Sequence, residues 1–429
     1  MNSRIGRTRV AEERPLNDAE RGKDVGLWFG VTVGLSVLAL VAQQLLLTLL
    51  LLTPALALGA AFIWQRFGLR RVRFSRRIEP ARAFPGDSVE LSLILENRKP
   101  LPLPWLDLRD TFPNALDYGE LELEARPKSD GWTFNSLVSA WANERVEQRC
   151  TIRCPQRGVY RFGPATLATG DPFGFSMRQA EHAHVDELLV YPRVLPVTNF
   201  GLPAAQPFGD ARPSRMVPDD PLRFLGTRPY IASDPPRQIH WRATARTNRV
   251  QSKTFERGAT AALAVFLDLS GDYLPDDDRS RQDREWAISA AASLVADGLD
   301  GQREVGLFSN ASLLGGSRFM RVAPSRQRVQ LMRILELLAQ LIPYALLPIG
   351  SLLLEEARRL PWGATVCVVT VAPSEKLIET LWRLQRVGFT ITLLIVGKAA
   401  IDVPRHGGFM VYHWQAEEQR ADPTHLQLV

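Results

Sequence analysis

The chain has few cysteines: three among 429 residues, at positions 150, 154 and 367. An odd and sparse set argues against a disulfide framework and favours a reducing compartment. Cys150 and Cys154 are four positions apart, which is not zinc-ribbon spacing, and there is no second pair to complete such a site. We therefore predict that all three cysteines are structural.

Two motifs of common enzyme classes are also missing. Neither GxGxxG nor GxxxxGK[ST] occurs between an expected strand and an expected helix, so nucleotide binding is not expected. The nucleophile elbow G-x-S-x-G is absent as well, so an esterase mechanism lacks its usual serine. These absences exclude two of the simplest readings of an α/β protein as an enzyme.

A third absence is charge between Val25 and Trp64. A single helix over this stretch would extend roughly 60 Å, about twice the hydrocarbon thickness of a bilayer. Two helices fit that length, with a turn between Gln43 and Pro54, and the stretch is too long for a secretory signal. We expect a hairpin of two transmembrane helices over residues 25–66.

Basic residues flank the apolar stretch on both sides. Six precede Val25, and six arginines follow Trp64 without an intervening acid: Arg66, Arg70, Arg71, Arg73, Arg76 and Arg77. Since basic flanks stay on the cytoplasmic side, both ends of a hairpin would lie there. We predict a multi-pass inner-membrane protein with a cytoplasmic tail at 1–24 and most of the chain in the cytosol. The arginines would contact anionic headgroups, which accounts for much of the net charge of +6 without nucleic acid.

Residues 67–200 have the pattern of a strand-rich module. In DSVELSLILEN, at 87–97, apolar residues alternate with mostly polar ones, as expected of a half-buried strand. Further short runs, among them WLDLRDTFP, VEQRCTIRC and ELLVYPRV, are separated by glycine and proline. We predict an all-β, sandwich-like module.

The turn sequence TGDPFGFS places Asp171 before Pro172. Asp171 could be taken for a catalytic carboxylate. The alternative is an Asp-Pro turn in which the side chain binds its own backbone, and we favour that interpretation.

Residues 259–429 alternate between buried strands and amphipathic helices. AALAVFLDLSG is a continuous apolar run, typical of a strand buried on both faces, and REWAISAAASLVADGLD predicts a helix. The alternation predicts a doubly wound α/β domain with helices on both faces. Ligands of such folds bind beyond the carboxyl ends of the strands, so the loops of interest begin at Asp268, Ser309 and Thr370.

The sequence DLSGD places Asp268, Ser270 and Asp272 at alternate positions after the first strand of this domain. Three oxygen ligands would suit a hard cation such as Mg²⁺. In the alternative interpretation, Asp268 and Ser270 cap the loop or helix that follows.

DLSGD after a buried strand, with the later strand LPWGATVCVVT, resembles the von Willebrand factor type A fold and its metal-ion-dependent adhesion site. That site combines D-x-S-x-S with a threonine from a second loop and an aspartate after a later strand. Here Asp272 replaces the last serine, and Ser351 is the nearest candidate for the threonine. Thr370 follows the later strand, which offers no aspartate. The resemblance therefore implies a partial site.

A bridging segment over residues 201–258 contains YIASDPPRQIHWRATARTNRVQSKTFER. Together with TGDPFGFS, the α/β domain and the hairpin, it resembles the bacterial family called domain of unknown function 58. The family pattern Y-x-x-G-D-x-x-R-x-I-H-W-x-x-S-A-R is matched by Tyr230, Asp234, Arg237, Ile239, His240, Trp241, Ala245 and Arg246. Ser233 replaces its glycine and Thr244 its serine. The resemblance implies a MoxR-type AAA+ ATPase as partner in protein assembly or maturation, and no established reaction.

The residues of this segment allow a catalytic interpretation. His240 could act as general base, with Asp234 orienting it and Thr244 as nucleophile of a hydrolase or transferase. Closeness in sequence does not supply the geometry of such a triad. More simply, IHWRATAR forms one helical turn or strand that Ile239 and Trp241 anchor in a core.

Basic residues of the same segment surround Trp241; Arg237, Arg242 and Arg246 are three of them. Phosphate binding is one interpretation, but there is no recognisable nucleic-acid fold, so we expect no nucleic-acid partner. We favour ion pairing between the modules or a basic surface for an acidic protein. The sequence as a whole predicts a non-enzymatic, membrane-anchored cytosolic scaffold that binds proteins at the carboxyl edge of its sheet, with or without Mg²⁺.

Overall fold

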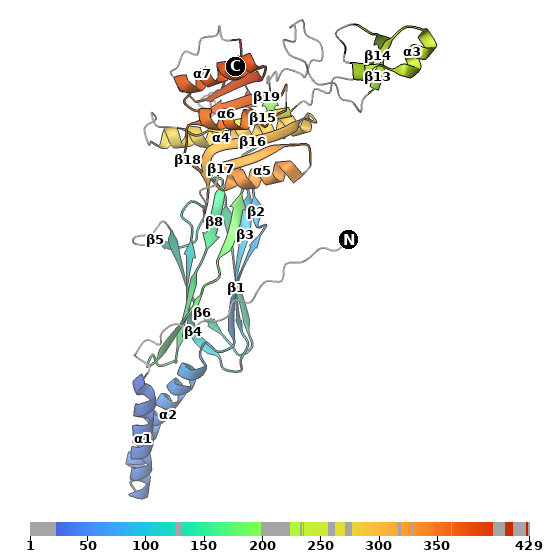
Figure 1. Cartoon of the computed structure of the whole chain (residues 1–429). Coiled ribbons are helices and arrows are strands. Elements are labelled where there is room, and N and C mark those ends of the chain that lie inside the picture. Colours follow the sequence, from blue (N-terminus) through green and yellow to red (C-terminus); the bar gives the residue numbers. More distant parts are fainter. Residues whose placement is uncertain are drawn as a thin grey trace. The chain divides into compact units, whose positions relative to one another are not determined.

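A computed structural model describes the following residues: 23–125, 131–198, 224–231, 234, 236–255, 262–270, 277–315, 319–327, 329–361, 363–397, 408–414 and 426–427. The chain divides into two compact units, Met1–Tyr191 and Pro192–Val429 (Figure 1).

The first unit begins with two apolar helices, α1 (Lys23–Val41) and α2 (Leu45–Phe67), which pack against each other (Figure 1). The turn at 42–44 falls at the start of the predicted interval, whereas Pro54 lies inside α2. By length and composition α2 can cross a membrane, and the apolar part of α1, Val25–Val41, is shorter. The apolar helix pair is confirmed, and the second membrane span stays a prediction.

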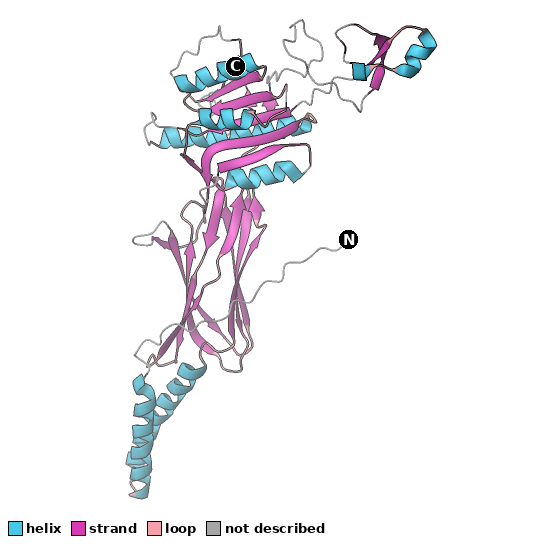
Figure 2. Ribbon diagram, in the orientation of Figure 1, coloured by secondary structure: helices cyan, strands magenta, loops and turns pink. Residues whose placement is uncertain are grey.

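The rest of the first unit is β-rich, as predicted (Figure 2). Its strands are β1 (Val72–Glu79), β2 (Arg82–Ala83), β3 (Ser88–Asn97), β4 (Leu103–Phe112), β5 (Leu123–Ala125), β6 (Trp132–Ala140), β7 (Arg145–Arg153), β8 (Gly158–Phe162), β9 (Ala165–Gly170), β10 (Met177–His182) and β11 (Asp186–Val190). They form sheets in the orders β1-β3-β7, β10-β9-β4-β6-β5 and β2-β11-β8. Every pairing is antiparallel except that of β2 with β11.

One hydrophobic core fills the β-rich part. The four apolar residues of β3 that share a face are buried as predicted: Val89, Leu91, Leu93 and Leu95. The strand is more buried than its alternation predicts, because Ser92 and Ile94 on the other face are buried as well. Phe112 stacks on Phe134 at 5.3 Å and meets Phe162 edge-on at 5.4 Å between ring centroids. Such aromatic contacts add to the stabilisation from burial.

Arg76 does not belong to the exposed basic collar. Its guanidinium is buried, 2.6 Å from a carboxylate oxygen of Asp110 and 2.8 Å from one of Asp186. It also donates to the backbone oxygens of Phe162 and His184. The expectation that Arg76 contacts headgroups is therefore wrong, because alternation in β1 turns this side chain into the core rather than outward.

The second unit contains a mixed sheet in the order β17-β16-β15-β19-β20-β21, with β18 also paired to β16. The strands are β15 (Ala262–Asp268), β16 (Glu304–Leu313), β17 (Phe319–Ser325), β18 (Leu341–Ala345), β19 (Thr365–Thr370), β20 (Thr390–Val396) and β21 (Met410–Trp414). β17 and β18 pair with β16 in antiparallel fashion, and the other pairings are parallel. All seven residues of β15 are buried, as its apolar run predicts.

Four helices cover this sheet: α4 (Asp278–Asp300), α5 (Val329–Ala339), α6 (Ile349–Ala357) and α7 (Glu375–Val387) (Figure 2). α6 and α7 share a core with one face, on which Phe266 and Val368 lie. α4 lies against the other face, where Gly298 fits closely over Leu263 and Val305. The predicted α/β region is confirmed.

The second unit also holds two small pairs of strands. β12 (Val197–Thr198) pairs with β22 (Leu426–Gln427). β13 (Phe224–Pro229) pairs with β14 (Gln251–Phe255) in antiparallel fashion, and between them lie a 3₁₀ turn, η2 (Pro236–Gln238), and the short helix α3 (Trp241–Thr247).

Candidate functional site

The segment from β13 to β14 is held together by hydrogen bonds between its own backbone groups, and we call it the braced segment. Ile239 forms a bridge with Ser252, and the His240 N–H donates to the Gln251 oxygen at 2.8 Å. α3 therefore starts directly beside β14. The polar side chains proposed for catalysis all lie in this brace, and the structure shows what each of them does.

His240 is the N-cap of α3. Its Nδ1 accepts a hydrogen bond from the Ala243 N–H at 3.0 Å. When Nδ1 accepts, the neutral imidazole carries its proton on Nε2, so the ring offers no free acceptor for a substrate proton. The cap thus occupies the nitrogen that a general base would need.

Thr244 is engaged in the same way. Its hydroxyl donates to the His240 carbonyl at 3.1 Å and accepts from the Gln251 N–H at 3.0 Å. The contact between Thr244 and His240 uses the backbone of the histidine and not its ring. A nucleophilic hydroxyl would have to give up these bonds.

Asp234 is bonded elsewhere. Its carboxylate lies 2.6 Å from Arg228 and accepts from the Ile231 N–H at 3.3 Å, while the Tyr230 hydroxyl donates to its backbone oxygen. The hydrogen bond from Arg228 lowers the pKa of Asp234. The structure does not bring Asp234, His240 and Thr244 together as a relay of side chains.

The basic residues of the segment face solvent. Arg237, Arg242 and Arg246 are exposed, and among the described residues none of them has a carboxylate partner. Trp241 is 70% exposed, so the prediction that it anchors a core is wrong, and Ile239 is half-buried. The reason is local: Trp241 is the first residue of α3, a short helix with no buried residue, and the bridge to β14 is made at Ile239, before the helix begins. The ion pairing expected of these arginines is not seen within this part of the chain.

A second cluster of polar side chains lies at the carboxyl edge of the parallel sheet. Asp268 ends β15 and is 2% exposed. One carboxylate oxygen accepts from the Ser270 N–H at 3.0 Å and from the Asn310 amide at 2.8 Å. The other accepts from the Thr370 hydroxyl at 2.9 Å. The loops flagged at Asp268 and Thr370 thus meet, as parallel strands require.

Asn310 is the residue that sequence reasoning missed. Its Nδ2 lies 2.8 Å from Asp268 Oδ1, 2.9 Å from Ser270 Oγ and 3.2 Å from the Leu347 carbonyl. We had expected a loop to begin at Ser309, but β16 continues to Leu313. Because the strand continues, Asn310 stays in the sheet and lies among these oxygens.

The described residues do not fit the expected Mg²⁺ ion. Asp272 lies outside the described residues, and Ser351 lies on α6 with an exposed side chain. Among the residues that are described, no three His, Cys, Asp or Glu side chains are grouped so as to hold a metal. The Asn310 amide already lies between the oxygens of Asp268 and Ser270 that a cation would bind.

The electrostatics of Asp268 follow from this arrangement. Burial raises the pKa of its carboxyl, although hydrogen bonds from Ser270, Thr370 and Asn310 oppose the increase. There is no cationic side chain among these partners. The site stabilises one carboxyl with neutral donors, which is a structural role, consistent with the capping interpretation.

The Asp171 turn is structural, as favoured from the sequence. Its carboxylate accepts from the N–H groups of Phe173, Phe175 and Ser176 and from the Ser176 hydroxyl. Burial alone would raise the pKa of Asp171, but these hydrogen bonds lower it overall. An Asp-Pro turn of this kind leaves no free carboxylate oxygen for catalysis.

The three cysteines are free. Cys154 and Cys367 are buried and Cys150 is half-buried. Burial raises the pKa of both Cys150 and Cys154 to about 11, and that of Cys367 to about 12. The thiols are therefore protonated at neutral pH and unreactive.

A family model described as protein of unknown function DUF58 matches residues 226–413. This region of the chain belongs to the DUF58 family. The DUF58 region begins in β13 and ends in β21, so it contains both the His240 segment and the Asp268 cluster.

One relative matches this chain over a stretch similar in length to the DUF58 region. Over 202 residues the chain is 22% identical to "Uncharacterized protein YeaD" of Bacillus subtilis (strain 168), which is 47% of this chain and 49% of the relative. The chain therefore matches about half the length of that protein. The name of that relative assigns it no activity.

Solved structures are similar to parts of the chain. An aerotolerance-related membrane protein from Bacteroides fragilis is 19% identical with a TM-score of 0.24, over 35% of this chain and 75% of that chain. The CARDB domain of the PF1109 protein from Pyrococcus furiosus is 16% identical with a TM-score of 0.20, over 28% and 86%. A cohesin module from Clostridium perfringens is 10% identical with a TM-score of 0.22, over 28% and 96%. TM-scores this low support no conclusion about fold or function.

Proposed function

We propose that this protein is a membrane-anchored cytosolic scaffold, and that α3 with its flanking residues binds an acidic surface on a protein partner. The observation that carries the proposal is the exposed set Arg237, Trp241, Arg242 and Arg246 on a braced segment. Tryptophan and arginine are the side chains most enriched among the residues that dominate binding energy at protein interfaces. We call these four residues the α3 surface.

Two features of the segment favour binding over chemistry. The polar atoms of His240 and Thr244 that catalysis would use are already hydrogen-bonded within the segment. Asp234 is paired with Arg228. A segment whose polar groups are used for bracing presents its remaining side chains in a fixed arrangement, which reduces the entropy lost on binding.

We propose that the partner is a MoxR-type AAA+ ATPase and that the pair acts in protein assembly or maturation. This step rests on the resemblance to the DUF58 family.

We further propose that the α/β region is a von Willebrand factor type A-like domain that needs no metal. Support comes from the order of its sheet. β15 lies between two parallel neighbours, β16 and β19, and the edge strand β17 is antiparallel to β16.

Membrane anchoring is the third part of the proposal. α2 is long and apolar enough to cross a bilayer, and α1 packs against it. We propose that the two form a hairpin in the inner membrane, with both flanks in the cytoplasm because both are basic.

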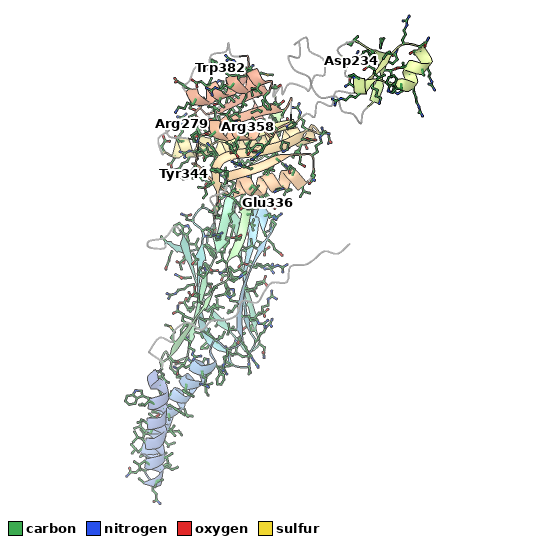
Figure 3. All side chains as sticks on the ribbon, in the orientation of Figure 1. Asp234, Arg279, Glu336, Tyr344, Arg358 and Trp382 are labelled. Atoms are coloured by element: carbon green, nitrogen blue, oxygen red, sulfur yellow. The ribbon has the colours of Figure 1, made fainter. Side chains whose placement is uncertain are left out.

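A co-purification experiment with the full chain in detergent tests the α3 surface. A variant with Trp241→Ala, Arg242→Gln and Arg246→Gln is expected to lose a co-expressed MoxR-type ATPase that the unmodified protein retains. The matched control carries Arg358→Gln, Arg383→Gln and Arg386→Gln, three exposed arginines outside the segment (Arg358 is labelled in Figure 3), and should retain it. Equal retention by both variants, or no retention by the unmodified protein in any nucleotide state, would contradict the proposal.

A further inference from the structure

Three connections of the β-rich part emerge at the end where α2 joins β1. They are residues 98–102, 141–144 and 171–176, which follow β3, β6 and β9. The Trp64 indole N–H donates to the Pro102 carbonyl at 3.0 Å, and the Lys99 ammonium donates to the Gly68 carbonyl. The end of α2 is therefore hydrogen-bonded directly to the first of these connections.

The other two connections are tied to the same place. The Asn143 N–H donates to the Lys99 carbonyl at 3.2 Å, which joins the second connection to the first. A Cβ on Gly68 would lie 3.2 Å from the side chain of Thr169, at the end of β9. The Trp105 indole N–H reaches the Asp171 carbonyl at 3.3 Å, so the third connection is held there too.

Exposed aromatic side chains project from two of these connections. Trp141 is 76% exposed, Phe173 56% and Phe175 51%. The rings of Phe173 and Phe175 are 6.0 Å apart. The Asp171 carboxylate accepts hydrogen bonds from the backbone N–H groups of Phe173 and Phe175 and so fixes the turn that carries both rings. Both phenyl rings are exposed, and none of the described residues covers the apolar surface that they form.

Positive charge accompanies the aromatic rings. Arg66, Arg70 and Arg71 lie at the junction of α2 and β1, and all three are exposed. Among the described residues none of the three has a carboxylate partner. Arg70 also lies over the Phe67 ring, 5.3 Å from its centroid. Aromatic side chains together with arginines that have no carboxylate partner are the combination found where proteins meet the headgroups of anionic bilayers.

We propose that this end of the β-rich part docks on an anionic phospholipid surface. Trp141, Phe173 and Phe175 enter the interface, and Arg66, Arg70 and Arg71 bind headgroup phosphates. The inference rests on the membrane anchoring proposed above. If α2 crosses the bilayer, its last turn lies at headgroup depth, and the connections bonded to that turn lie there with it. The GDPFG turn is then a membrane contact and not a catalytic loop.

Site-directed fluorescence on the full chain in vesicles tests this contact. Single Trp141→Cys and Phe173→Cys variants are labelled with an environment-sensitive dye, and quenching by lipids that carry a shallow doxyl group is measured. The native cysteines are buried or half-buried with raised pKa, so the unmodified chain gives the labelling background. Each labelled variant must keep the melting temperature of the unlabelled chain.

Two further labels serve as controls. Phe84→Cys places the dye on another exposed aromatic position, before β3. Ten residues of strand separate it from the docking end, which is roughly 30 Å at about 3.3 Å per residue. Leu56→Cys places the dye within α2, where an exposed leucine would face lipid.

The outcomes separate the two proposals. We expect blue-shifted emission and quenching at 141 and 173, stronger in phosphatidylcholine vesicles that contain phosphatidylserine than in phosphatidylcholine alone, and water-like emission at 84. Labels at 141 and 173 that behave like the one at 84, while 56 is quenched, would overturn the docking but leave the anchor intact. Equal quenching with and without phosphatidylserine would overturn the role of the arginines. No quenching at 56 would show that the anchor itself is wrong.

Discussion

Asp171 and Asp268 are two buried carboxylates that the sequence offers as candidates for chemistry. Asp268 is the last residue of β15, and Asp171 directly follows β9. Neither has a cationic partner among its hydrogen-bond donors. Nevertheless the pKa is lowered at Asp171 and raised at Asp268. The difference shows how donors and desolvation compete at a buried acid.

The donors explain the lower pKa at Asp171. Three backbone N–H groups and one hydroxyl point at its carboxylate, and the turn that covers it is itself exposed. Asp268 accepts from one backbone N–H, one amide and one hydroxyl, between strands that are buried on both faces. Fewer donors, together with desolvation between buried strands, favour the neutral form of Asp268.

The largest expected effect is at Asp268, the acid at the end of a fully buried strand. Asp268→Ala leaves the donors from Ser270, Asn310 and Thr370 without their acceptor, which should lower the free energy of unfolding by about 3 kcal/mol or more. Asp268→Asn keeps one acceptor oxygen and removes the ionisable group, so it should cost about 1 kcal/mol or less. Denaturation of the full chain, in which the unfolding of the α/β region is followed, measures the loss of stability in each variant. Equal losses would show that the donors do not depend on Asp268.

The second prediction tests whether the Asn310 amide takes the place of a cation. Asn310→Asp puts a second carboxylate beside Asp268 Oδ1, which is destabilising because like charges repel. Millimolar Mg²⁺ or Ca²⁺ should then raise the melting temperature of the variant, since a ligand that binds the folded state stabilises it. The unmodified protein should show no such increase. A metal-dependent increase in the unmodified protein would contradict the absence of a cation at this edge.

A smaller loss is expected at the exposed turn. Asp171→Ala removes the acceptor of the Phe173, Phe175 and Ser176 N–H groups. Water can reach the donors of the exposed residues Phe173 and Phe175, so we expect a loss of about 1 to 2 kcal/mol. Asp87→Ala is the control, because Asp87 accepts one turn N–H, from Phe84, at an exposed site. It should cost about 0.5 kcal/mol. A loss at Asp171 no greater than at Asp87 would show that the four donors contribute little.

The smallest effect is the pH dependence, and its sign differs between the two acids. The pKa of Asp171 is lowered on folding, so its contribution is present above the unfolded pKa of about 3.9 and is lost as pH falls through the folded pKa. The pKa of Asp268 is raised, so stability in its unit falls as pH rises from about 3.9 through the folded pKa.

Stability measured against pH for the unmodified chain and for the variants Asp171→Asn and Asp268→Asn separates the two contributions. Removing Asp171 should flatten a rise of stability with pH, and removing Asp268 should flatten a fall. If the contributions of the two acids to stability changed with pH in the same direction, the predicted difference between Asp171 and Asp268 would be wrong.

Local patterns in the sequence were sufficient for much of the fold. The uncharged stretch gave the apolar helix pair, the apolar face at 87–97 gave β3, and the apolar run gave β15. Burial of one face produces alternation and burial of both faces produces a continuous apolar run, and neighbouring residues already show either pattern. The Asp-Pro turn at Asp171 could be read for the same reason, since its donors lie within five residues of the carboxylate.

What the sequence could not show were contacts between residues far apart in the chain. Asn310 meets Asp268 across 42 positions and Thr370 meets it across 102, so no local pattern marks either donor. The exposure of Trp241 also escaped prediction, because large aromatic residues are usually buried whereas α3 has no buried residue.

The sequence by itself determined the order of parts, the family-specific segment and which stretches are apolar, because these depend on composition and on short periods. Only the folded structure shows that the Asn310 amide donates to Asp268 and that His240 caps a helix. It also shows that Trp141 and Phe173 are exposed at the end where α2 joins the β-rich part. Those outcomes depend on which atoms compete for the same space and the same hydrogen bonds, and that competition exists only once the chain has folded.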